Sequence, residues 1–211
     1  MALNSIPSIC VVDIGSPRLG NLGWYLYDAF RDVSHSGDDL DAMIAPLQQV
    51  LENSSVLLGL EAPLFVPVRT DLMLATKARS GENPRPWSAG AGAQVLAMNL
   101  PIMTYLFQRL RHDQCSFTMD ADAFSGLSGE ILVFEALVSG SDKGQSHIED
   151  AQIMVRYCHT YAKEHQLPPS ILQSEKGVAY MNLVACALLF TGHLQSLDNL
   201  SVASPIYRPS E

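Results

Sequence analysis

One acid inside an apolar run is the feature that most restricts how this chain folds. The run begins at Ile9, continues through Val12, then carries Asp13 and ends at Gly15 before a Ser-Pro pair. An apolar stretch of this length indicates a buried strand. A carboxylate there is costly unless it is paired, hydrogen-bonded or bound to a metal. Asp13 therefore either meets partners from elsewhere in the chain or is an ordinary turn-forming acid at a strand end.

Two further acids stand in comparable places. Glu61 closes the apolar run at residues 56–60, which also indicates a buried strand. Asp150 lies near the start of a helical pattern that begins at about His147, and a spacing of three residues puts these two side chains on one helix face. If the fold brings Asp150 and Glu61 to Asp13, the three carboxylates form a site for a hard divalent metal.

Each of these residues also has a plainer interpretation. Glu61 can pair with a nearby arginine such as Arg69 instead of a metal. An acid in the first turn of a helix, as Asp150 is expected to be, is favoured by the helix dipole whatever its function. Glu135 lies among apolar residues of an expected central strand, so it either faces the site or forms a buried salt bridge.

The order of the expected elements predicts an α/β fold in a single domain of 211 residues. A central mixed sheet would begin with an antiparallel hairpin, continue with parallel strands and carry helices on both faces. The expected strands cover residues 9–14, 22–27, 30–34, 56–60 and 131–138, and the expected helices cover residues 40–51, 93–111, 147–164 and 176–191. Functional sites of such sheets lie at the carboxyl ends of the strands, where Asp13 and Glu61 are expected.

Composition narrows the function classes. The net charge of −9 argues against broad nonspecific binding to a nucleic-acid backbone, so any phosphate contact must be local. No apolar run approaches the roughly 20 residues that span a bilayer. The N-terminus also lacks the basic-then-apolar order of a secretory signal, and we therefore expect a cytoplasmic protein without a membrane partner.

Residues 62–91 carry four prolines and are expected to form an irregular insertion between core elements, with a short helical piece at about residues 71–78. The segment contains arginines and a tryptophan suited to phosphate contact and base stacking: Arg69, Arg79, Arg85 and Trp87. The same side chains would suit a homodimer contact. The sequence leaves both interpretations open.

The motifs occur in a recognisable order. They are an Asp-x-Gly strand at Asp13, a hairpin, a strand ending in Glu-x-Pro at Glu61, a strand with Phe134-Glu135 and a His-x-x-Asp-Ala helix from His147. This order resembles the ribonuclease H superfamily over roughly residues 8–160. Within it, the chain is most similar to uncharacterised predicted nucleases of that fold and secondarily to Holliday-junction resolvase-like proteins.

The resemblance implies a metal-dependent nuclease that cleaves nucleic acid by a two-metal carboxylate mechanism. It implies that Asp13, Glu61 and Asp150 bind Mg²⁺ or Mn²⁺, that His147 is the accompanying histidine, and that Glu135 is a recurrent strand glutamate. These five residues are the candidate catalytic set.

Departures from the pattern leave alternatives open. Glu149 stands beside Asp150, so either could be the ligand, and the insertion at residues 62–91 has no counterpart in the minimal fold. One alternative is a catalytically inactive interaction module that uses the insertion to bind a partner or itself. Another is an actin-like or sugar-kinase-type phosphotransferase. That class also opens with an Asp-x-Gly strand, but it needs a second such half and a Gly-rich adenosine motif.

Overall fold

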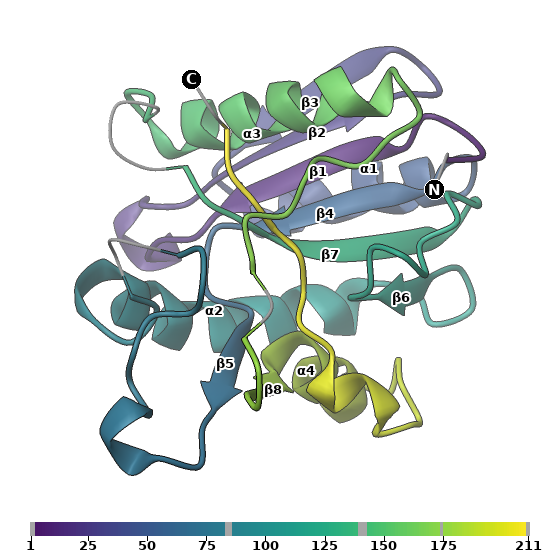
Figure 1. Cartoon of the computed structure of the whole chain (residues 1–211). Coiled ribbons are helices and arrows are strands. Elements are labelled where there is room, and N and C mark those ends of the chain that lie inside the picture. Colours follow the sequence, from purple (N-terminus) through teal and green to yellow (C-terminus); the bar gives the residue numbers. More distant parts are fainter. Residues whose placement is uncertain (1–2, 83–85, 139–142, 174, 210–211) are drawn as a thin grey trace.

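The computed structural model describes residues 3–82, 86–138, 143–173 and 175–209 (Figure 1). Its main feature is a seven-stranded mixed sheet with the order β3-β2-β1-β4-β7-β6, in which β9 also pairs with β7. These strands are β1 (Ser8–Asp13), β2 (Gly23–Asp28), β3 (Val33–Gly37), β4 (Val56–Leu60), β6 (Ser116–Thr118), β7 (Glu130–Ala136) and β9 (Ile206–Tyr207). The helices are α1 (Leu40–Leu51), α2 (Gly90–Arg109), α3 (His147–Ala162) and α4 (Leu183–Thr191).

The strand directions confirm the expected α/β class. β1 to β3 form an antiparallel meander, whereas β1, β4 and β7 run parallel to one another. Val12 lies opposite Leu60 in the β1–β4 register, and the backbone N–H of Glu61 donates to the Val12 carbonyl at 2.9 Å. The carboxyl ends of β1 and β4 therefore meet at one edge of the sheet, with Asp13 beside Glu61.

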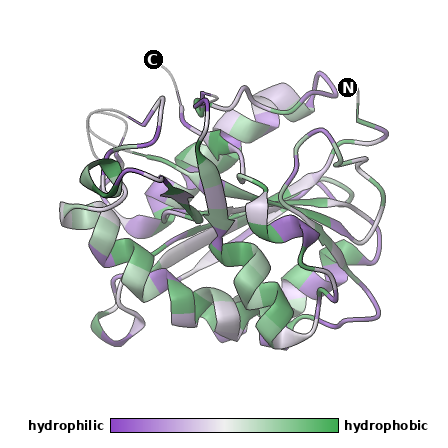
Figure 2. Cartoon of the chain, turned by 60° about the horizontal axis from the view of Figure 1, so that its bottom comes forward, coloured by the Kyte–Doolittle hydropathy of each residue, from purple (hydrophilic) through white to green (hydrophobic). Residues whose placement is uncertain are grey.

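Two apolar layers hold helices on both faces of this sheet. Alternate residues of β1 divide between them: Cys10 and Val12 pack in the layer of α1, α2 and α4, whereas Ile9 and Val11 pack in the layer of α3. Every residue of β1 is buried, because a central strand covered on both sides needs apolar side chains in both directions. Figure 2 shows the hydrophobic residues concentrated on the strands and on the helices that cover them.

The region expected to be a helix at residues 176–191 is partly a strand, which corrects that prediction. Residues Ala179–Asn182 form β8, and α4 begins only at Leu183, after the Asn182 side chain accepts a hydrogen bond from Ala185 N. β8 pairs antiparallel with β5 (Phe65–Val68), inside the insertion that was expected to be irregular. Such long-range pairing leaves little trace in local hydrophobic periodicity.

The third strand lies later than expected. The predicted strand at residues 30–34 is a turn followed by β3, because the Asp28 carboxylate accepts hydrogen bonds from the backbone N–H groups of Phe30 and Arg31. Such a side-chain hydrogen bond stabilises a turn after the strand. β6 and β9, of three and two residues, were not expected from the sequence.

No helix in the described part of the chain is long and apolar enough to cross a membrane.

Gly23 lets α3 approach the sheet closely. It lies opposite Asp13 in the β1–β2 register. A Cβ atom at this position would lie 2.4 Å from the backbone carbonyl carbon of His147, a distance at which backbone must move. The first turn of α3 therefore rests directly on the start of β2, next to Asp13.

Replacing Gly23 with alanine tests this close approach. The added Cβ would force α3 away from β2 or distort the strand, and we expect Gly23→Ala to lower the free energy of unfolding by about 3 kcal/mol. Gly177→Ala is the control, because a Cβ there meets no atom within 4 Å although φ is +77°. That variant should lose about 1 kcal/mol. Urea denaturation measures the free energy of unfolding of both variants. Equal losses would show that the packing of α3 on β2 does not require a glycine at position 23.

Candidate metal centre

Three elements bring three carboxylates together. Asp13 is the last residue of β1, Glu61 directly follows β4, and Asp150 lies in the first turn of α3. One carboxylate oxygen from each residue lies within 4.8 Å of the others. The parallel β1–β4 pair sets the first two positions, and the contact of α3 with Gly23 sets the third.

These carboxylates are largely withdrawn from solvent. Asp13 is 3% exposed and Asp150 is 5% exposed, while the Glu61 side chain is 15% exposed. Burial, followed by the negative charge of Asp13, raises the pKa of Glu61 to about 9, and Asp150 acts in the same direction. The cluster therefore holds more negative charge than its surroundings neutralise, which is the condition that favours binding of a cation.

Lys143 provides part of the missing positive charge. Its Nζ atom lies 3.2 Å from Asp150 Oδ2 and 3.5 Å from Glu61 Oε1. Partial burial acts to lower the pKa of Lys143, but the Glu61 and Asp150 carboxylates raise it above its ordinary value, so the side chain stays charged. The backbone N–H of Gly144 donates to Asp150 Oδ1 at 2.6 Å.

Lys143 was not among the site residues predicted from the sequence. The residue belongs to no motif, although it is the sole lysine or arginine between Arg111 and Arg156. Asp150 follows only seven residues later, so the sequence could have indicated that the two side chains pair. Its contact with Glu61 depends on the fold.

His147 contacts Asp13 directly. Its Nδ1 atom lies 2.6 Å from Asp13 Oδ2, and its side chain is 38% exposed. Since an ionised carboxylate only accepts hydrogen bonds, Nδ1 carries a proton when Asp13 is charged. Nε2 is then the ring nitrogen that can take a proton from another group.

The acid beside Asp150 is not part of the cluster. Glu149 is exposed, and its carboxylate accepts a hydrogen bond from the backbone N–H of Gln145. Because successive residues of a helix point in different directions, only one of the two acids can turn towards β1 and β4. The structure places Asp150 there.

A cleft lies over the acids. It has a volume of 210 Å³, and its lining includes Asp13, Glu61, Lys143, His147 and Trp87. Carboxylate oxygens are the ligands that hard divalent cations prefer, and the cleft leaves room beside them for water or substrate. The arrangement can hold a metal ion.

Comparison with protein-family models, with curated protein sequences and with solved structures gave no significant match. The case for a function therefore depends on the geometry of this site.

Glu135 lies in a buried ion pair beside the cleft and is not a member of the acidic cluster. The guanidinium of Arg79 donates to both Glu135 oxygens at 2.7 and 2.8 Å, and Leu64 N donates to one of them at 3.1 Å. Arg79 also pairs with Glu82 at 2.8 Å. Both interpretations left open for Glu135 therefore apply, because it forms the buried salt bridge and also lines the cleft.

The four residues expected at the substrate have different surroundings. Arg79 is 2% exposed and its charge is taken by two carboxylates, so it is not available to a substrate. Arg69 pairs with Glu175 at 3.0 Å, not with Glu61, and donates to backbone carbonyls of its own segment. Arg85 lies outside the described residues. Trp87 lines the same cleft as Asp13 and Glu61.

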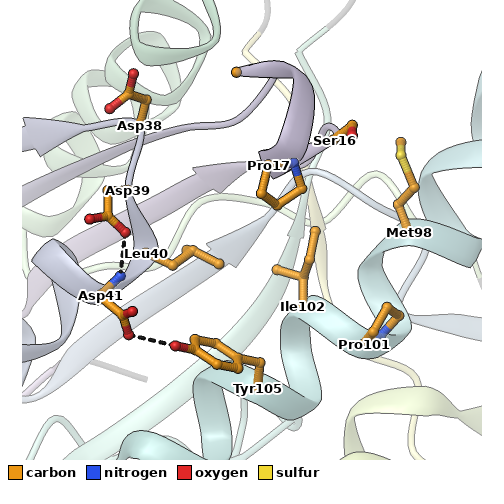
Figure 3. A pocket seen from close by; sticks show the side chains of 11 residues that line it. Ser16, Pro17, Asp38, Asp39, Leu40, Asp41, Met98, Pro101, Ile102 and Tyr105 are labelled. Atoms are coloured by element: carbon orange, nitrogen blue, oxygen red, sulfur yellow. Dashed lines mark hydrogen bonds between the residues drawn. The ribbon is translucent and has the colours of Figure 1, made fainter.

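A larger cavity of 730 Å³ lies between α2 and the start of α1, and none of the three clustered acids lines it. Figure 3 shows its apolar wall, with Pro17, Leu40 and Ile102, and acids at its edge. Asp41 accepts a hydrogen bond from the Tyr105 hydroxyl at 2.6 Å. The three converging carboxylates belong to the smaller cleft and not to this cavity, so we place the candidate site at the smaller cleft.

Breaking the buried ion pair tests its contribution to stability. Arg79→Met leaves Glu82 and Glu135 without their partner, and we expect a loss of about 3–5 kcal/mol in the free energy of unfolding. The control is Arg111→Met, whose pair with Asp113 is exposed and should contribute less than about 0.5 kcal/mol. Chemical denaturation compares the two. Equal losses would mean that the Arg79 pair does not fasten the insertion to β7.

The raised pKa of Glu61 predicts a pH-dependent effect of Glu61→Gln. Between the ordinary value of 4.5 and about 9, folded Glu61 holds a proton that the unfolded chain releases, so its contribution to stability falls as pH rises. Glu61→Gln removes this loss. In metal-free buffer, we expect it to stabilise the protein by on the order of 2 kcal/mol at pH 8, with little effect at pH 5.

Glu52→Gln is the matched control, since Glu52 is exposed. Thermal unfolding at both pH values measures the difference between the variants. Glu61→Gln that stabilises no more than Glu52→Gln at pH 8 would contradict the electrostatic account of the cluster.

Proposed function

We propose that this chain is a metal-dependent nuclease that hydrolyses phosphodiester bonds of nucleic acid. The observation that carries the proposal is the convergence of Asp13, Glu61 and Asp150 within 4.8 Å from three distant parts of the sequence. Three carboxylates in a partly buried cleft destabilise the folded state, and binding of a functional cation explains why they are there.

The ligand chemistry supports Mg²⁺ or Mn²⁺. All three donors are carboxylate oxygens from well-separated elements, and hard cations with open coordination positions suit such a set. Such an ion activates water as a nucleophile near neutral pH and stabilises negative charge on the leaving oxygen of a phosphodiester.

The chain's own residues supply orientation and proton transfer. The three carboxylates would hold the ion, and the hydrogen bond between His147 Nδ1 and Asp13 Oδ2 fixes the orientation of both side chains. His147 Nε2 accepts a proton from the attacking water. Trp87, which also lines the cleft, is the aromatic side chain on which a base of the substrate can stack.

The arrangement of the sheet supports a relation to the ribonuclease H superfamily. The antiparallel β1–β3 meander is followed by β4 and β7 parallel to β1, as that resemblance predicts. The acids also stand where the resemblance places the metal ligands, at the ends of β1 and β4 and in the first turn of α3.

An inactive interaction module is the second candidate. The insertion carries two apolar side chains that lie open to solvent, Leu72 with 84% and Met73 with 87% exposure. Large apolar side chains in such positions are typical of interaction surfaces. This candidate requires no metal, so metal binding separates it from the nuclease.

Asp13→Asn should abolish tight metal binding. The substitution removes one anionic ligand while it keeps the size of the side chain, and we expect Mn²⁺ affinity to fall on the order of a hundredfold. Isothermal titration at millimolar Mn²⁺ measures the effect. Cleavage of single-stranded and duplex DNA and RNA should be lost in parallel.

Asp38→Asn is the control for the change in net charge. Asp38 is exposed at the edge of the larger cavity, as Figure 3 shows. We expect it to bind Mn²⁺ as the wild type does. Absence of Mn²⁺ binding by the wild-type chain, or equal binding by Asp13→Asn, would refute the nuclease proposal and favour the interaction module.

A further inference from the structure

Lys143 lies inside the acidic cluster. Its ammonium lies 3.5 Å from the Glu61 carboxylate and 3.2 Å from the Asp150 carboxylate. A salt bridge to one acid would be an ordinary surface contact. Contact with two of the three candidate ligands places the ammonium within the space that cations would share.

The backbone holds Lys143 in this position. Gly144 N donates to Asp150 Oδ1 at 2.6 Å, so the peptide group next to Lys143 is tied to a candidate ligand. Gly144 also lies tightly against α3, because a Cβ there would be 2.5 Å from Glu149 Cβ. The chain therefore approaches the helix closely at this point, and the lysine side chain extends over the acids.

The charge balance favours one divalent ion. When all three acids are ionised as metal ligands, Asp13, Glu61 and Asp150 carry three negative charges, and Lys143 carries one positive charge. A single divalent ion balances the remainder, whereas two such ions would leave an excess of positive charge in a partly buried site.

We propose that the acidic centre takes one divalent ion, and that the Lys143 ammonium supplies the positive charge that a second ion would bring. This inference rests on the proposed nuclease function and refines its two-metal mechanism. Lys143 has three N–H donors, of which two face Glu61 and Asp150. The third is available to a phosphate oxygen of the substrate, since the side chain is 44% exposed and lines the cleft.

Counting bound Mn²⁺ tests the inference without any substrate. Electron paramagnetic resonance reports free Mn²⁺ during a titration to millimolar concentration, using the full chain. The variant is Lys143→Met, which keeps a long unbranched side chain and removes its charge. The control is Lys163→Met, the same change at an exposed position that follows α3.

We expect one bound ion per chain in the wild type and in Lys163→Met. Lys143→Met should bind Mn²⁺ about tenfold more tightly, because a fixed positive charge beside the ion is gone. Two bound ions in the wild type would overturn the inference but leave the nuclease proposal standing. Unchanged or weaker binding by Lys143→Met would also overturn it, since the lysine would then only support the acids. No binding by any variant would refute both proposals.

Discussion

The parallel pairing of β1 with β4 is the constraint on which the candidate site depends. It puts the carboxyl ends of two buried strands side by side, so that Asp13 and Glu61 must face the same small space. Electrostatic repulsion and loss of solvent oppose this arrangement, as the raised pKa of Glu61 shows. The apolar layers on both faces of the sheet hold the strands together against that opposition. Local destabilisation of this kind is typical of functional sites.

Two further features complete the site from outside the β1–β4 pair. Gly23 allows α3 to approach β2, which brings Asp150 and His147 to the acids of the sheet. The ion pair of Arg79 with Glu135 fastens the insertion to β7, and the insertion then contributes Trp87 to the wall of the cleft. The cleft is therefore assembled from the sheet, one helix and one long insertion. The close approach at Gly23 positions the helix, and the buried ion pair positions the insertion.

The acids were predictable from the sequence because each leaves a local signal: an acid in an apolar run for Asp13, a strand end for Glu61 and a shared helix face for Asp150. The antiparallel-then-parallel sheet followed from the order of strands and helices. Pairing between distant residues left no such signal. The β5–β8 pair, the partner of Glu135 and the contact of Lys143 with Glu61 all join residues far apart in the chain. Arg79 was therefore interpreted as a substrate contact although the fold buries it.

Anomalous diffraction from crystals soaked in Mn²⁺ tests the central claim most directly, because it locates the ion without any assumption about substrate. The account predicts a peak at about 2.2 Å from a carboxylate oxygen of each of Asp13, Glu61 and Asp150. A complete data set at millimolar Mn²⁺ with no peak among these oxygens, or with peaks only at other acids, would contradict the claim that the convergence of the three carboxylates exists to hold a metal ion.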